Sequence, residues 1–164
     1  KEIEKLSTQI SLIYRNYHKK SDPEELRKLV THCRANRRKV YISNNLKDAI
    51  KYNFNGLYIP SFHKQLRFQN ITKKNLEIIG SAHNANELKI KEKQGCSHIF
   101  LSPVFRNNKN KKFLDVIKTN LLKKLTKNQI VLLGGINQKT IKRSKLCAPS
   151  GLAAISWIKK TAQV

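Results

Sequence analysis

The stretch Gln129-Ile130-Val131-Leu132-Leu133-Gly134-Gly135-Ile136-Asn137 is a short apolar run that ends in two glycines. A second stretch, Gly151-Leu152-Ala153-Ala154-Ile155-Ser156, follows it after a helix-like segment. Two consecutive strand ends that offer glycine and backbone N–H groups, with a helix between them, are how a (β/α)₈ barrel holds a phosphate. The pair of stretches therefore makes a phosphorylated small molecule the first ligand to consider.

Short runs of apolar and β-branched residues recur along the whole chain, and each is bounded by polar or turn residues, as buried parallel strands are. They cover residues 10–15, 39–43, 56–60, 76–80, 98–102, 129–133 and 151–157. Helix-like segments alternate with these runs, at residues 21–33, 46–52, 85–94, 114–125 and 138–146.

Two of the helix-like segments carry clear terminal signals. Asp22 and Pro23 supply an N-cap and a first-turn proline, and Leu26 and Val30 follow on an apolar face. Gly95 stands where the segment at 85–94 would need a left-handed stop.

Strict alternation of strands and helices predicts a parallel sheet covered by helices. An open doubly wound sheet usually carries a glycine-rich loop after its first strand, whereas residues 14–19 contain no glycine. A closed barrel needs eight strands, and residues 1–9 resemble the tail of a helix that precedes the second strand. We therefore predict a single α/β domain over residues 1–164, a (β/α)₈ TIM barrel whose first strand is missing from this sequence or lost.

The composition limits the range of partners. The formal charge is +24, from 34 Lys and Arg against 10 Asp and Glu. Basic residues are spread over the whole chain with few aromatic residues between them, which favours a compositional bias over a nucleic-acid surface. Three isolated cysteines predict a cytoplasmic protein with reduced thiols. Apolar runs too short for a membrane helix exclude a membrane partner, and a homo-oligomer is left open.

Polar residues follow nearly every predicted strand, and ligands of a barrel enzyme sit at these carboxyl ends. They are Arg15, Ser43, Asn44, Ser61, His63, Ser81, His83, Ser102, the loop 106–112, the segment 134–137 and Ser156. His83 could equally well hydrogen-bond a loop carbonyl, and Arg15 could form a surface ion pair. No Asp or Glu directly follows a strand, so we predict no metal ligands. His98 begins a strand at the opposite end and is interpreted as structural.

Several motifs in order resemble the thiamine phosphate synthase family, which includes the TenI-like thiazole tautomerases. They are Gly80-Ser81-Ala82-His83, Gly95-Cys96-Ser97-His98-Ile99-Phe100-Leu101-Ser102-Pro103-Val104-Phe105, Leu133-Gly134-Gly135-Ile136-Asn137 and Gly151 to Ser156. The resemblance covers residues 10–158. It implies a (β/α)₈ barrel that joins an aminopyrimidine methyl diphosphate to a thiazole phosphate, with Mg²⁺ as cofactor and pyrophosphate as product.

The resemblance also assigns roles to single residues. Gly134 and Gly135, with the backbone of Ile155 and Ser156, would hold the thiazole phosphate. Arg15 would bind the diphosphate, and Ser81 would contact the pyrimidine diphosphate.

This sequence departs from the family at the metal site and at a loop. The two metal-binding aspartates of the family correspond here to Ser43-Asn44 and to about His63. The threonines in the family's loop after strand six correspond to a segment that starts at Asn107. Lys109 or Lys111 could supply a replacement cation. Leaving-group charge is stabilised chiefly by metal and cations, so we predict weak or degenerate synthase activity. The alternatives are a non-catalytic binder of a phosphorylated thiazole or similar phosphate ester, and a nucleic-acid binder.

Overall fold

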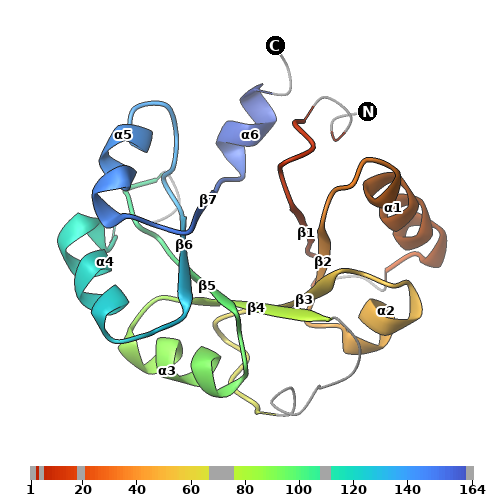
Figure 1. Cartoon of the computed structure of the whole chain (residues 1–164), viewed down its shortest axis with the longest axis horizontal. Coiled ribbons are helices and arrows are strands. Elements are labelled where there is room, and N and C mark those ends of the chain that lie inside the picture. The colour runs from red at the N-terminus through yellow and green to blue at the C-terminus, as the bar shows by residue number, and fades with distance from the viewer. Residues whose placement is uncertain (1–2, 4–5, 18–20, 67–75, 108–111, 162–164) are drawn as a thin grey trace.

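The computed structural model describes residues 3, 6–17, 21–66, 76–107 and 112–161 and shows one curled sheet with helices on its outer side (Figure 1). The strands are β1 (Leu12–Tyr14), β2 (Val40–Ser43), β3 (Gly56–Ile59), β4 (Glu77–Ala82), β5 (His98–Leu101), β6 (Gln129–Leu133) and β7 (Gly151–Ala153). The helices are α1 (Pro23–Ala35), α2 (Leu46–Lys51), α3 (Ala85–Lys93), α4 (Asp115–Lys124), α5 (Ile141–Ser144), the 3₁₀ helix η1 (Lys145–Cys147) and α6 (Ser156–Thr161).

All strand pairs are parallel, and the strands stand in the sheet in the order β1 to β7. The sheet curls into a half-barrel that stays open between β1 and β7, on the side where both termini lie (Figure 1). The TIM-barrel-like fold is thereby confirmed, with the eighth strand of a full barrel missing among the described residues. Within the described ranges, no helix has the length and apolar character needed to cross a membrane.

The helix signals in the sequence act as predicted. The side chain of Asp22 accepts a hydrogen bond from the Glu24 backbone N–H at 3.0 Å and so caps α1. Leu26, Val30 and Cys33 are the buried residues of this helix. Gly95 has φ +76°, the left-handed conformation expected after the end of α3.

Three predicted boundaries are wrong. The run at 151–157 is not one strand, because β7 ends at Ala153 and α6 begins at Ser156. β7 is an edge strand that pairs only with β6, so no second neighbour extends it. The helix predicted at 138–146 divides into α5 and η1, which ends at Ala148 with φ +40°.

The third correction concerns the segment before β1. Its described residues form turns and a bend in place of a helix tail. The buried guanidinium of Arg38 donates to the backbone carbonyls of Leu6, Ser7 and Ile10 at 2.9, 2.9 and 3.0 Å. These bonds hold the backbone carbonyls of a segment that forms no regular helix, and the Ser7 carbonyl also accepts from the Ile10 N–H at 3.1 Å.

Alternate residues of the strands face two different apolar layers, as the period of a strand requires. The outer layer packs against the helices and includes Ile42, Leu57 and Leu101. The inner layer contains Tyr41, Tyr58, Ile79, Phe100 and Val131, with the rings of Tyr58 and Phe100 edge to face at 5.9 Å. A cavity of about 780 Å³ lies beside this inner layer.

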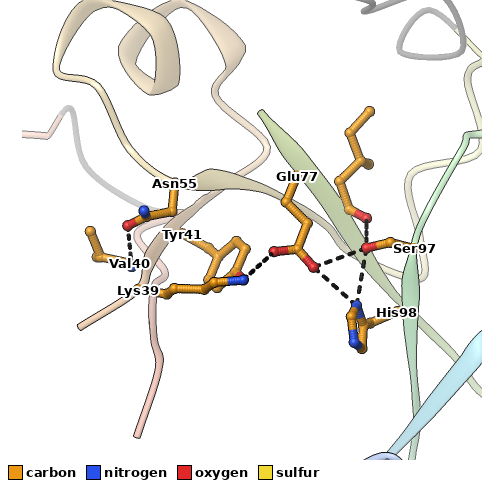
Figure 2. Close-up of polar contacts among 8 residues, drawn as sticks. Lys39, Val40, Tyr41, Asn55, Glu77, Ser97 and His98 are labelled. Atoms are coloured by element: carbon orange, nitrogen blue, oxygen red, sulfur yellow. Dashed lines mark hydrogen bonds and ion pairs between the residues drawn. The ribbon is translucent and has the colours of Figure 1, made fainter. Parts of the chain in front are cut away.

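A polar cluster joins three strands at their amino ends (Figure 2). The carboxylate of Glu77 accepts hydrogen bonds from the hydroxyls of Tyr41 at 2.7 Å and Ser97 at 3.0 Å. It also forms an ion pair with Lys39 at 3.2 Å, and His98 Nδ1 lies 3.0 Å from its other oxygen. Burial alone would raise the pKa of Glu77, but the bonds from Tyr41, Lys39 and Ser97 hold it below its ordinary value. Burial raises the pKa of Tyr41, and Glu77 raises it further.

We expect Gly56→Ala to destabilise the protein by about 1–3 kcal/mol through overpacking. A Cβ atom at Gly56 would lie 2.1 Å from the Glu77 carbonyl oxygen and 2.7 Å from the Tyr41 ring. Gly151→Ala is the matched control, because the nearest atoms to its Cβ are the Val131 methyl carbons at 3.6 and 3.8 Å. Urea unfolding of both variants measures the difference, and equal losses would contradict the prediction.

Candidate active site at the carboxyl ends of the strands

Arg15, Ser43 and Ser81, three of the predicted residues, lie together around two tyrosines. The guanidinium carbon of Arg15 lies 5.6 Å from the ring centroid of Tyr58 and 5.3 Å from that of Tyr17. The Arg15 Nε–H donates to the Tyr17 hydroxyl at 3.2 Å, and the Ser43 hydroxyl donates to the same oxygen at 2.9 Å. The Tyr58 hydroxyl shares a hydrogen bond with Ser81. The structure therefore brings these three residues together with two tyrosines that the sequence did not single out, and their roles in a site stay a prediction.

Tyr58 keeps a neutral hydroxyl next to the Arg15 charge. Burial raises the pKa of Tyr58, and the bond from Ser81 and the charge of Arg15 oppose this rise only in part. A guanidinium beside several hydroxyls suits anionic oxygens, because hydrogen bonds to charged groups are the strong ones. The feature that links Tyr58 to this cluster is the strand register, because Ser43 on β2 pairs with Tyr58 on β3.

Gly134 and Gly135 lie so close to the segment after β5 that a side chain at either position would collide with it. Their φ angles are +89° and +72°. A Cβ atom at Gly135 would lie 2.5 Å from the Phe105 carbonyl oxygen, and one at Gly134 would lie 2.8 Å from Pro103. The Phe105 N–H donates to the Gly134 carbonyl at 3.0 Å, so the segment after β5 lies directly on the glycine pair.

The second predicted phosphate segment lies next to the glycine pair. Leu133 pairs with Ala153 at the ends of β6 and β7, so the residues that follow each strand leave the sheet side by side. Ile155 is 59% exposed, and Ser156 is exposed at the start of α6. The predicted cradle is thus open to solvent on the β7 side.

His83 connects the ends of three strands. Its Nε2 lies 3.0 Å from the hydroxyl oxygen of Ser61, after β3, and its Nδ1 hydrogen-bonds the backbone carbonyl of Ser102, after β5. The His83 backbone N–H donates to the Glu87 carboxylate at 2.8 Å. The loop-carbonyl bond that the sequence left as an alternative is therefore present, together with a contact to a serine.

His63 contributes a backbone carbonyl to the anchoring of its own loop. That carbonyl accepts hydrogen bonds from Lys91 Nζ at 2.8 Å and from Gln94 Nε2 at 3.0 Å. Lys91 is fully buried and also donates to the Pro60 carbonyl at 2.7 Å and to Gln94 Oε1 at 2.8 Å. Burial lowers the pKa of Lys91 to about 8. Sequence reasoning missed this lysine, because a lysine on a surface helix normally faces water.

The remaining candidates are only partly placed. Asn44 has φ +54° and donates its backbone N–H to the Tyr58 carbonyl at 2.9 Å, beside the Arg15 cluster. Asn107 ends a described range, and Lys109 and Lys111 lie outside the described residues. Their roles as cations or ligands remain predictions.

The carboxylates near this edge do not fit a site for Mg²⁺. Among the described residues, no three His, Cys, Asp or Glu side chains gather closely enough to hold a metal ion. Asp48 accepts from the Asn45 side chain at 2.6 Å, and Asp115 forms an ion pair with Arg143 at 2.9 Å. The Glu87 carboxylate is bonded to the backbone of His83. These oxygen ligands are therefore engaged with protein partners.

Comparison with known proteins yields one family. The family model described as "Thiamine monophosphate synthase" matches residues 7–158. Thiamine-phosphate synthase of Methanococcus vannielii is 33% identical over 84 residues, which are 49% of this chain and 41% of that protein. The Methanococcus maripaludis protein of the same description is 31% identical over 86 residues, 51% of this chain and 42% of that protein. The aligned part thus spans about two fifths of these relatives.

Solved structures support the fold. Thiamine phosphate pyrophosphorylase from Pyrococcus furiosus superposes with a TM-score of 0.74 at 16% identity, covering 99% of this chain and 82% of that one. FabK from Thermotoga maritima superposes with a TM-score of 0.66 at 10% identity, covering 84% and 48%. At these identities the likeness is one of fold.

The buried Lys91 predicts a pH dependence of stability. The folded chain releases this proton near pH 8, whereas the unfolded chain holds it to about 10.5. Between these values the unfolded state binds more protons, so the free energy of unfolding rises with pH. We expect the stability of the parent relative to Lys91→Met to rise by on the order of 1–3 kcal/mol across this interval.

Urea unfolding at a series of pH values measures this difference. The control is Lys89→Met, an exposed lysine on the same helix, for which the difference should stay flat. A flat difference for Lys91→Met would show that its ammonium group is not destabilised by burial.

Proposed function

Since the chain belongs to the thiamine monophosphate synthase family, we propose that its carboxyl-edge site couples an aminopyrimidine methyl diphosphate to a thiazole phosphate. The coupling breaks the C–O bond to the diphosphate and releases pyrophosphate. The single observation that carries the proposal is the convergence of Arg15 with the hydroxyls of Ser43, Tyr58 and Ser81. These groups come from the ends of four neighbouring strands of one parallel sheet.

In this proposal the Arg15 cluster and the glycine segments bind different substrates. Arg15 holds the diphosphate and stabilises the charge that develops on it, because donors fixed in advance need no reorganisation during the reaction. Gly134, Gly135 and the backbone of Ile155 and Ser156 hold the thiazole phosphate. The left-handed glycines allow the β5 loop to approach closely, which fixes the shape of this half.

The cofactor is the point at which this chain departs from its family. Mg²⁺ would stabilise the leaving diphosphate, yet the described carboxylates do not fit a site for it. The cationic task therefore falls to Arg15 and, in the prediction, to Lys109 or Lys111. We accordingly propose a slow synthase.

A second candidate function is binding of a phosphate ester without catalysis. The observation that favours it is the engagement of Asp48, Glu87 and Asp115 with protein partners. Binding at the glycine half would then persist without turnover.

The proposal extends to location and partners. The three cysteines are free and buried, and burial raises the pKa of each thiol, as suits a reducing cytoplasm. The partners proposed are phosphorylated small molecules, without nucleic acid. A homo-oligomer is compatible with the exposed Ile117, Leu121 and Leu146 on the outer surface.

We expect Arg15→Gln to lower the rate of thiamine phosphate formation by about 100-fold, the cost of losing one fixed donor to developing charge. The assay mixes both phosphorylated precursors with the protein over a range of Mg²⁺ concentrations. Arg27→Gln is the matched control, because Arg27 also stacks on a tyrosine, at 6.0 Å from the Tyr52 ring, but belongs to α1. If the parent chain forms no product at high concentration, the catalytic part of the proposal is wrong.

Thiazole phosphate at 100 times its dissociation constant should stabilise the protein by about 2.7 kcal/mol and raise its Tm by roughly 5–10 °C. We expect Gly135→Ala to lose this shift, because its Cβ would displace the Phe105 carbonyl. Gly95→Ala, with a similar φ of +76° and open space at Cβ, is the control that should keep it. A shift of equal size in both variants would place the phosphate elsewhere.

A further inference from the structure

We propose that Ser61 and His83 form a nucleophilic serine centre that hydrolyses small carboxylic esters, an activity separate from the coupling reaction. The Ser61 hydroxyl oxygen lies 3.0 Å from His83 Nε2. The other ring nitrogen of His83 is bonded to the Ser102 carbonyl. A serine within hydrogen-bond reach of a base that a third group orients is the arrangement that activates such a nucleophile.

The Ser102 carbonyl decides which nitrogen of His83 carries the proton. A carbonyl oxygen only accepts hydrogen bonds, so the Nδ1 atom facing it carries the hydrogen. In the neutral ring, Nε2 then presents its lone pair to Ser61, and the serine hydroxyl donates to it. This is the tautomer that a general base needs.

Both side chains of the centre are held by their surroundings. The loop that carries Ser61 is anchored by the buried Lys91, which donates to the carbonyls of Pro60 and His63 on either side. The backbone of His83 is fixed by its bond to Glu87 at 2.8 Å. Reactive side chains that their surroundings already hold in place need no rearrangement during the reaction. Ser61 is half-buried and His83 is exposed, so a small substrate can reach them.

The chain contains a second serine–histidine contact that lacks this property (Figure 2). Ser97 lies 3.0 Å from His98 Nδ1, but the same nitrogen lies 3.0 Å from the Glu77 carboxylate. Since a carboxylate only accepts, that nitrogen carries a proton and cannot take one from Ser97. The Ser97 hydroxyl itself donates to Glu77 at 3.0 Å. Ser97 is therefore the built-in control for Ser61.

The proposed reaction has two balanced steps. The Ser61 oxygen attacks the acyl carbon while its proton moves to His83 Nε2, and His83 returns this proton to the leaving alkoxide as the ester C–O bond breaks. Water then attacks the acyl-serine, giving its proton to Nε2, and the Ser61–acyl bond breaks as His83 returns this proton to the Ser61 oxygen, which releases the acid. The Ser102 carbonyl accepts the Nδ1–H throughout and stabilises the imidazolium.

A fluorophosphonate probe, followed by peptide mass spectrometry of the intact folded chain, tests the centre. The expected result is an adduct on Ser61 that is absent in Ser61→Ala and forms about 100-fold more slowly in His83→Gln. Ser97→Ala should label like the parent. The absence of an adduct on Ser61, or equal labelling of Ser97, would overturn the proposal.

Turnover of p-nitrophenyl acetate gives a second readout. Lysines react with this ester only once each, so several turnovers per chain separate catalysis from acylation of the many surface amines. We expect steady turnover to fall about 100-fold in Ser61→Ala and to persist in Ser97→Ala. Turnover that survives in Ser61→Ala would refute the serine mechanism. The Tm shift with thiazole phosphate should remain in Ser61→Ala, so failure here is distinguishable from failure of the proposed synthase function.

Discussion

Continuous parallel pairing from β1 to β7 is the constraint on which the rest of the structure depends. It brings all seven carboxyl ends to one edge and all amino ends to the other. The register then decides which side chains become neighbours, as Ser43 and Tyr58 do on β2 and β3. Because residues alternate between the faces of a strand, the same pairing separates the outer apolar layer from the inner one. The Arg15 cluster, the glycine pair and the Ser61–His83 contact all follow from this one arrangement.

The two edges of the sheet carry different polar clusters, and the proposed chemistry lies at one of them. At the amino edge, the carboxylate of Glu77 on β4 binds Tyr41 on β2, Lys39 just before β2 and Ser97 just before β5 (Figure 2). At the carboxyl edge, Arg15 and His83 are exposed, whereas Ser43, Tyr58 and Ser81 are buried. This division agrees with the general location of barrel active sites at the carboxyl ends of the strands. The two serine–histidine contacts also differ, since among the described residues the ring of His98 has a carboxylate partner and the ring of His83 has a backbone carbonyl.

Basic residues serve inside this protein as well as on its surface. Arg38 is buried beneath the segment before β1, and Lys91 is buried beneath the loop after β3. Both hold backbone carbonyls and have no carboxylate in hydrogen-bond contact among the described residues. Gly80 makes room for Lys91, because a Cβ there would lie 2.8 Å from the lysine Cδ. Part of the high positive charge is therefore structural.

The sequence by itself determined the alternation of strands and helices, the Asp22 cap, the left-handed Gly95 and the polar strand ends, because these depend on local spacing and hydrogen bonds. It also placed Arg15, Ser43 and Ser81 at one edge of the sheet, since carboxyl ends of parallel strands meet there. Only the tertiary structure decided that Tyr17 and Tyr58 join them, that Lys91 is buried and that His83 reaches both Ser61 and Ser102. Each of these contacts joins residues from different strands or loops, and the curl and register of the sheet, which no local pattern encodes, set their distances.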